Sequence, residues 1–147
     1  MLSFREAPIL LKAFKKLKAA PDLVIFDSQG IAHPRGLGLA AHIGLFLDTP
    51  TIGCAKSRLI GEYREPGARA GCRTALTHDG ERIGTVLRTR NGVKPVFVSP
   101  GHLMDHAGAV RWVLRCCRRY RLPEPTRQAH ILVNQIRRGE PARVEAL

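Results

Sequence analysis

Hydrophobic residues recur every three or four positions in three segments, which predicts amphipathic helices over 7–20, 105–120 and 126–138. Asp105 stands where it can cap the second helix. Prolines at 123 and 125 separate the second helix from the third. The apolar stripes are Leu10, Ala13, Phe14 and Leu17; then Val110, Val113, Leu114 and Cys117; and last Ala129, Leu132, Val133 and Ile136.

Two short runs have no polar alternation, as in strands covered on both faces. They are 23–26 and 51–55, and an apolar segment at 37–47, expected to be a helix, lies between them. Strand, helix and strand within about thirty residues form a βαβ unit, whose two strands run parallel. Asp27 and Lys56 directly follow the two strands, so both should lie at one edge of one sheet, where open α/β sheets place their sites.

The middle of the chain predicts a loop and then a hairpin. Residues 61–79 are rich in Gly and charge and indicate a surface loop, while 83–87 and 95–99 flank Asn91-Gly92, a hairpin signal. The 147 residues therefore predict a single α/β domain, 1–147, with a parallel core and helices on it.

Charge indicates the kind of partner. Lys and Arg number 24 against 12 Asp and Glu, which gives a net charge of +12. Such an excess favours a polyanion, with nucleic acid ahead of an anionic membrane, although an Arg-favouring genome would give a similar excess. The four cysteines form no C-x-x-C pair, which indicates reduced thiols. With no transmembrane run and no signal peptide, we expect a cytoplasmic protein without a membrane partner.

Asp27 is the strongest candidate for chemistry. A carboxylate directly after a buried strand is costly unless paired, and a divalent cation such as Mg²⁺ would offset that cost. A turn cap explains Asp27 equally well. Lys56 could hold a scissile phosphate as a point charge, or be an ordinary solvated lysine.

The remaining candidates are weaker when each is taken alone. Glu6 fits an S-x-x-E capping box with Ser3, the better interpretation from spacing. His33 could orient water, bind metal or exchange a proton, and the nearby Arg35 could hold a phosphate, although a lone loop histidine usually has no chemical role. His130 lies beside the buried stripe of the last helix.

A row of arginines lines the 105–120 helix, which suggests a phosphate-facing surface, although a solvated face is the default. Its members are Arg111, Arg115, Arg118 and Arg119.

Read together, six segments closely resemble the endonuclease V family, whose members nick DNA near deoxyinosine. They are LSFRE at 2–6, PDLVIFD at 21–27, GIAHPR at 30–35, PTIGCAKSRL at 50–59, VSPGH at 98–102 and RLPEPTR at 121–127. They cover nearly the whole chain in order. The resemblance implies a ribonuclease H-like α/β/α sandwich with a mixed sheet.

The resemblance also implies roles for single residues. Glu6 and Asp27 match family residues that bind the catalytic Mg²⁺, which places Glu6 above its capping interpretation. His33, Lys56 and His130 match active-site positions, and Arg5 matches the Arg of the first motif. The implied reaction is attack of a metal-activated water on a phosphodiester bond of DNA. The resemblance does not decide whether the preferred substrate is DNA or inosine-containing RNA, or whether the metal ion is Mg²⁺ or Mn²⁺. It also leaves the oligomeric state open.

The chain departs from the family pattern in two places. Ser28 stands where the family usually has Gly. The family also has, before its Phe-Arg-Glu motif, strands with another metal-binding Asp and a Pro-Tyr-Ile-Pro-Gly wedge, and neither occurs here. We therefore expect 1–147 to be the C-terminal two-thirds of the family's length, with little or no nicking activity and marginal stability alone.

Two alternatives to an active endonuclease follow from the same residues. One is a catalytically inactive nucleic-acid-binding remnant of the family that uses the arginine row. The other is an unrelated basic RNA-binding protein, which no aromatic-rich RNA-binding signature supports.

Overall fold

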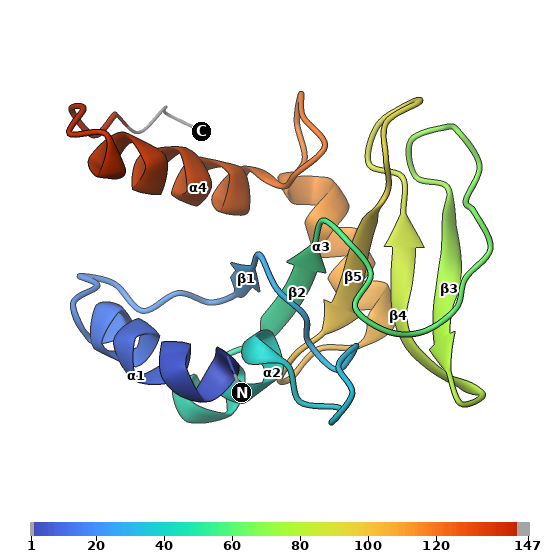
Figure 1. Cartoon of the computed structure of the whole chain (residues 1–147), viewed down its shortest axis with the longest axis horizontal. Helices are drawn as coiled ribbons and strands as arrows, with labels where there is room; N and C mark the ends of the chain where they lie inside the picture. The colour runs from blue at the N-terminus through green and yellow to red at the C-terminus, as the bar shows by residue number, and fades with distance from the viewer. Residues whose placement is uncertain (1, 144–147) are drawn as a thin grey trace.

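The computed structural model describes residues 2–143, with side chains from residue 5 onward. A five-stranded mixed sheet, in the order β1-β2-β5-β4-β3, forms the centre of the molecule (Figure 1). The elements are α1 (Leu2–Lys15), β1 (Val24–Phe26), α2 (Leu39–Leu47), β2 (Thr51–Ala55), β3 (Arg73–His78), β4 (Glu81–Leu87), β5 (Val96–Pro100), α3 (His106–Cys116) and α4 (Glu124–Arg137).

The predicted βαβ unit is confirmed. β1 pairs with β2 in parallel, with Val24 opposite Thr51 and Phe26 opposite Gly53. Alternate residues of β2 point to opposite faces of the sheet. Ile52 and Cys54 pack in the core under α3, whereas the Thr51 hydroxyl donates to the Ala40 carbonyl of α2 over 2.7 Å. Helices therefore cover both faces, which is the α/β/α sandwich predicted from the sequence.

The predicted hairpin is also confirmed, since β4 and β5 are antiparallel around the turn that contains Asn91 and Gly92. The prediction of a loop over 61–79 is wrong at its end, because β3 adds an outer strand to β4. Only Leu76 of β3 is buried, so an edge strand carries little of the apolar pattern that marks a strand. The Asp79-Gly80 turn was the overlooked signal: both residues have positive φ, as a two-residue hairpin turn requires.

The helix boundaries differ from the predictions, most clearly for α1, α3 and α4. α1 starts at Leu2 and ends at Lys15, before Leu17, whose side chain is 52% exposed and so adds nothing to the apolar stripe. α3 has the predicted Asp105 cap, with Gly108 N–H donating to its carboxylate over 2.6 Å, but the chain becomes extended at Cys117. α4 begins at Glu124, because Pro125 fits the first turn of a helix and does not break it.

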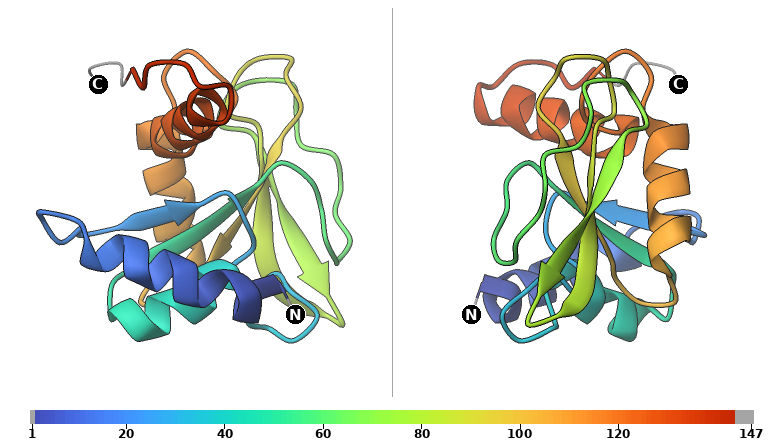
Figure 2. Two further views of the ribbon diagram at one scale, coloured as in Figure 1. Left: turned by 60° about the vertical axis from the view of Figure 1, so that its left-hand side comes forward. Right: turned by 90° about the vertical axis from the view of Figure 1, so that its right-hand side faces the viewer.

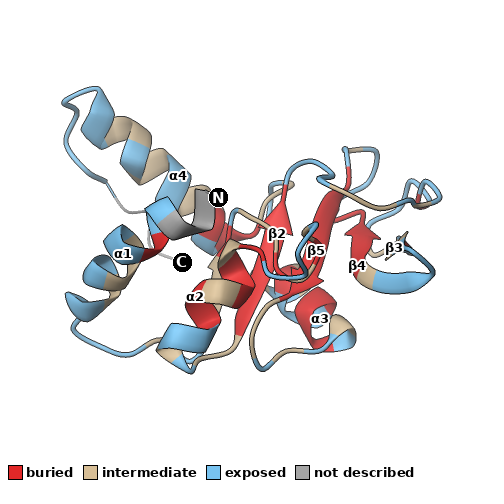
Figure 3. Cartoon of the chain, turned by 60° about the horizontal axis from the view of Figure 1, so that its bottom comes forward, coloured by how far each residue is buried: buried red, intermediate tan, exposed pale blue. Residues whose placement is uncertain are grey.

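The predicted buried stripe of α4 is wrong. Val133 is 54% and Ile136 is 62% exposed, and Ala129 is also exposed. Figure 3 shows the contrast between the buried central strands and the largely exposed helices α1 and α4. In Figure 1, α4 extends beyond β1 and not across the face of the sheet. The amphipathic pattern of α4 therefore has no covering partner among the described residues.

Of the three hydrophobic clusters that the described residues form in the core, the largest lies under α3 and another lies under α1 and α2. Ile52, Leu87, Val96 and Val98 meet Val113 in the first. The second brings Phe26 of β1 together with residues of both N-terminal helices, Ala7, Ala40 and Ile43. All four cysteines are free, as predicted. No helix of the described part of the chain is long and apolar enough to cross a membrane.

Candidate active site

Asp27 and Lys56 lie side by side at the ends of two parallel strands. Lys56 Nζ is 3.0 Å from Asp27 Oδ2, and the two side chains are 39% and 42% exposed, respectively. Because β1 and β2 are parallel neighbours, their carboxyl ends meet at one edge of the sheet, as the sequence predicts. The pair is therefore held by the fold and is also accessible to a partner molecule.

The loop after Asp27 is packed closely on the sheet beneath it. A Cβ on Gly53 would overlap the backbone of Gly30, so the loop can lie directly on β2 only because residue 53 is glycine. Gly30 N–H donates to Ser99 Oγ over 2.8 Å, and Ile31 N–H donates to the Pro100 carbonyl over 2.8 Å. These contacts fix the position of the carboxylate that precedes them.

Arg121 binds the backbone of Lys56, directly after the end of β2. Its guanidinium donates to the backbone carbonyls of Lys56 and Pro95, each over 2.7 Å, and of Lys94 over 2.8 Å. One side chain thus ties the end of β2 to the start of β5. The sequence showed Arg121 only as the first residue of the RLPEPTR segment, and nothing in its spacing predicted this bridging role.

His33 is partly buried in the loop that follows Gly30. Its Nδ1 accepts the backbone N–H of Arg35 over 3.2 Å. Burial lowers the pKa of His33, and the positive charge of the neighbouring Arg35 lowers it further. A neutral ring whose Nδ1 accepts a hydrogen bond carries its proton on Nε2, so His33 presents an N–H donor.

Glu6 and Arg5 are exposed on α1, inside the helix and not before it. The predicted helix, 7–20, began after Glu6 and is therefore wrong at its start. The Ser3 side chain of the suggested capping box lies outside the described side chains. Neither Glu6 nor His33 forms a hydrogen bond or ion pair with Asp27 or Lys56 among the described residues.

His130 is exposed on α4 and lies 3.1 Å from Asn134, measured from its Nε2 to the amide nitrogen. The start of this helix is fixed by Glu124, whose carboxylate accepts two hydrogen bonds from Arg127, each 3.0 Å long. These hydrogen bonds lower the pKa of Glu124 against the opposing effect of its burial. Arg127 in turn lies over the Tyr120 ring, 4.2 Å from its centroid.

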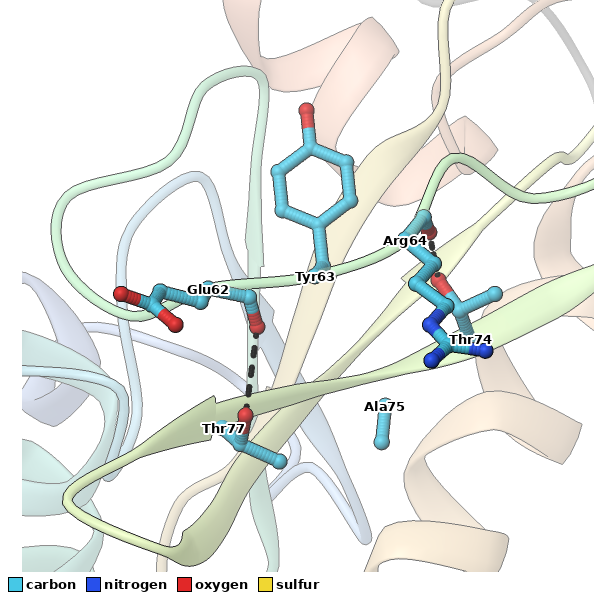
Figure 4. Close-up of a pocket in the computed structure, with 6 residues that line it drawn as sticks. All are labelled: Glu62, Tyr63, Arg64, Thr74, Ala75 and Thr77. Atoms are coloured by element: carbon cyan, nitrogen blue, oxygen red, sulfur yellow. Dashed lines mark hydrogen bonds between the residues drawn. The ribbon is translucent and has the colours of Figure 1, made fainter.

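An open cavity of about 710 Å³ adjoins Lys56. Four cations contribute to its lining, namely Lys56, Arg58, Lys94 and Arg121, against the single carboxylate of Glu65. A second, shallow pocket lies between the 62–64 segment and β3, where Thr77 and Thr74 donate to the backbone carbonyls of Glu62 and Arg64 (Figure 4). None of the predicted site residues lines that second pocket, so the cavity beside Lys56 is the one relevant to the Asp27 edge.

At this edge of the sheet, the Asp27 carboxylate could serve as one ligand of a metal ion. Asp27 Oδ1 has no hydrogen bond or ion pair with a described residue, and the carboxylate is half exposed. Within residues 2–143, no group of three or more His, Cys, Asp or Glu is arranged to hold a metal ion. Mg²⁺ takes one or two carboxylates and completes its shell with waters and substrate phosphates, so a single placed carboxylate is compatible with it.

Comparison with known proteins identifies the relatives of this chain. The family profile described as Endonuclease V matches residues 1–131. A curated endonuclease V of Kosmotoga olearia is 58% identical over 139 residues, covering 94% of this chain and 62% of the relative. The chain thus spans about three-fifths of the length of the curated relatives it matches.

Solved structures give the same result. The endonuclease V of Streptomyces avermitilis superposes with a TM-score of 0.89 at 42% identity, covering 94% of this chain and 60% of that one. An endonuclease V of Ciona intestinalis, solved in complex with a 23-mer DNA containing an inosine followed by a ribo-adenosine, gives a TM-score of 0.79 at 29% identity, with 95% and 66% coverage. These neighbours have a ribonuclease H-like fold, and the described sheet and helices superpose on it.

Proposed function

The chain belongs to the endonuclease V family, and we propose that it supplies active-site residues for hydrolysis of a phosphodiester bond near deoxyinosine in DNA. The observation that carries this proposal is the accessible Asp27–Lys56 pair at the ends of two parallel strands. The inosine-containing DNA bound by the Ciona intestinalis relative supports the choice of substrate. DNA repair is then the role of the reaction.

Lys56 and Arg35 act on the substrate as cations in this proposal. Lys56 stands at the rim of a cavity lined mainly by positive groups, so a phosphate of the bound strand is attracted to it. Its ammonium can donate to a non-bridging oxygen and stabilise negative charge that develops during hydrolysis. We propose that Arg35, exposed two residues after His33, holds a neighbouring phosphate, and that Arg5 of α1 is a further substrate contact.

His33 and His130 are the proposed groups for handling protons and water. The lowered pKa keeps His33 neutral near pH 7, with its proton on Nε2. A neutral imidazole in this tautomer can orient a water molecule or donate to a substrate oxygen. His130 lies on α4, and we propose that it approaches the same edge of the sheet from the helix side.

Asp27 and Glu6 are the residues that would hold Mg²⁺, with Mn²⁺ as the alternative ion. A bound divalent cation would supply a nucleophilic water at neutral pH and stabilise charge on the phosphate. Asp27 contributes a hard oxygen donor whose position is fixed by β1 and by the packed loop after it. Lys56 orients that carboxylate by pairing with one of its two oxygens.

A second function, nucleic-acid binding without catalysis, is favoured by one observation, the four cations that line the cavity beside Lys56. A protein of this kind would bind the damaged strand and leave its phosphodiester bonds intact.

A nicking assay separates the two functions. The purified 147-residue chain is incubated with Mg²⁺ and a labelled duplex that contains one deoxyinosine, beside a matched duplex without it and an RNA strand with one inosine. Nicking that requires Mg²⁺, is confined to the inosine strand and disappears in Asp27→Asn supports the endonuclease. Binding to the same duplex without nicking supports the second function.

Asp22→Asn is the control variant, because Asp22 is exposed, lies before β1 and pairs with no described cation. We expect it to leave nicking and binding within about twofold of the parent chain, since isolated surface charges contribute little. The absence of both binding and nicking in the parent chain would contradict both functions.

A further inference from the structure

A third cavity, distinct from the two described above, lies on the α3 side of the sheet, between α3 and the outer strands β3 and β4. It has a volume of about 560 Å³, and four arginines from these three elements surround it. They are Arg73 of β3, Arg82 of β4, and Arg111 and Arg115 of α3. Figure 2 (right) shows α3 on one side of these strands and the segment between β2 and β3 on the other.

Placing four guanidinium groups around one cavity is electrostatically unfavourable without an anion. No carboxylate of the described residues pairs with any of the four within 4.0 Å. Arg82 alone is anchored by hydrogen bonds, to Thr85 Oγ over 2.7 Å and to the Gly84 carbonyl over 3.3 Å. The fold therefore brings these charges together without neutralising them.

The other three arginines do little to hold the fold together. Arg115 lies over the Trp112 ring, 5.4 Å from its centroid, and Arg73 and Arg111 form no hydrogen bond or ion pair with the described residues. Arg111 and Arg115 are four residues apart on α3, so their side chains project from the same helix face. Neither guanidinium has a hydrogen-bond or ion-pair partner among the described residues, so both can engage a ligand.

His106 also lines this cavity. Its Nδ1 is buried and has no hydrogen-bond partner among the described residues. Burial lowers its pKa, and the charge of Arg82 lowers it further. A neutral His106 ring adds no charge to the four arginines, so the ligand that suits this cavity is an anion.

We propose that this cavity binds phosphate groups of a nucleic-acid strand, and so forms a second contact with the polymer outside the Asp27 edge. The inference rests on the proposed function in one respect, since it takes nucleic acid as the partner. The two sites come from different elements: β1 and β2 carry the Asp27–Lys56 pair, whereas α3, β3 and β4 carry the cavity. Only Arg111 and Arg115 of the predicted arginine row line the cavity. Arg118 and Arg119 follow the end of α3 and do not line it.

The test is the affinity of the chain for a 20-base-pair duplex without deoxyinosine, measured by fluorescence anisotropy in EDTA so that nicking plays no part. We expect Arg111→Gln with Arg115→Gln to weaken binding about tenfold at low salt. The slope of log affinity against log salt concentration should fall by about two, because each lost phosphate contact removes roughly 0.9 from it. Glutamine suits a helix nearly as well as arginine, so α3 should be preserved.

The matched control is Arg64→Gln with Arg69→Gln, which removes the same charge from exposed positions in the segment on the other side of the sheet. We expect this pair to change affinity less than twofold. If both pairs weaken binding equally, net charge explains the effect and the proposal is overturned. Should the α3 variant unfold on heating at a lower temperature than the parent, Arg73→Gln tests the same cavity from β3, with an expected three- to fivefold loss.

A titration with inorganic phosphate distinguishes a polymer site from a site for a small free anion. Loss of phosphate binding in the α3 variant, with unchanged duplex affinity, would overturn the proposal in favour of a small anion. Duplex binding that none of the cavity variants alters would overturn this inference alone. A parent chain that binds no duplex would overturn both this inference and the proposed function.

Discussion

Lys56 and Asp27 divide two tasks at the edge of the sheet: the carboxylate has one oxygen free, and the ammonium faces a positive cavity. We expect little nicking from residues 1–147 alone. For the Mg²⁺-dependent nicking that this chain retains, we predict that Lys56→Gln lowers the rate about 100-fold, because one fixed donor to a charged transition state is typically worth that much. Single-turnover kinetics on the deoxyinosine duplex would measure it.

Lys94→Gln is the comparison for that experiment. Lys94 lines the same cavity, but it forms no ion pair with a described residue and does not adjoin Asp27. A loss below about threefold is expected. Equal losses in the two variants would mean that the cavity's overall charge matters and the position of Lys56 does not.

Glu124 controls stability through its pairing with Arg127. The side chains are 8% and 16% exposed, and hydrogen bonds from Arg127 lower the pKa of Glu124. A carboxylate whose pKa falls on folding stabilises the protein above its unfolded pKa, near 4.5, and loses that contribution as the pH falls through the lower folded value. We predict that Glu124→Gln lowers the free energy of unfolding by about 2 kcal/mol at pH 7.

Thermal unfolding of the parent chain and of Glu124→Gln between pH 7 and pH 3 measures this effect. The difference in Tm should shrink below about pH 4.5, where the unfolded carboxyl becomes protonated. A difference that stays constant across this range would show that the hydrogen-bond geometry, and not the charge, stabilises the start of α4.

At the scale of elements, the sequence predicted the parts that are covered on both sides. β1, α2 and β2 have continuous apolar runs, so their type, and the parallel pairing that places Asp27 beside Lys56, followed from the pattern. β3 was overlooked because a single buried residue, Leu76, marks it. The stripe of α4 was misjudged because periodicity shows which face is apolar and not whether anything covers it.

Arg121 and Ser99, which hold the backbone around the site, could not be predicted from the sequence for a related reason. Arg121 bonds to three carbonyls that are between 26 and 65 residues away in the chain, and Ser99 bonds to Gly30 across 69 positions. Contacts this distant depend on the assembled sheet and leave no local signal. The family resemblance supplied Glu6, His33 and His130 as proposals, and spacing alone would have left each of them in doubt.

Gly53 links strand packing to the site. Alanine at this position would overlap the Gly30 backbone, so we predict that Gly53→Ala displaces the loop after Asp27. Overpacking of this kind costs about 1 to 3 kcal/mol. The expected result is a lower Tm together with an at least tenfold reduction of the nicking that the parent chain retains, because the carboxylate moves away from Lys56.

Cys54→Ala provides the control on the same strand. Cys54 is buried on the α3 side, so its truncation leaves a small cavity there and does not touch the 28–30 loop. A reduced Tm with a nearly unchanged nicking rate is expected. If Gly53→Ala lost stability but kept its rate, the packed loop would not be what positions Asp27.

At the scale of the whole molecule, two features have opposite effects on self-association. The net positive charge opposes it, and the open edge of β1 with the exposed apolar side chains favours it. Among the described residues β1 pairs only with β2, so alternate backbone groups of β1 face an open edge. Large apolar side chains are exposed on the neighbouring helices, including Ile9 at 71%, Phe46 at 63% and Ile136 at 62%. A net charge of +12 repels copies of the chain from one another and keeps these surfaces apart at low salt.

This balance predicts association that increases with ionic strength. The Debye length falls from about 10 Å at 0.1 M salt to about 3 Å at 1 M, which removes most of the repulsion between surface charges but leaves apolar attraction in place. Sedimentation velocity from 0.05 to 1 M NaCl should show a monomer that gives way to larger species. Ile9→Lys with Ile136→Lys would suppress the association if helix faces drive it, and would leave it unchanged if the edge of β1 does. A monomer at every salt concentration would contradict the prediction, because screening would then have revealed no attraction to oppose.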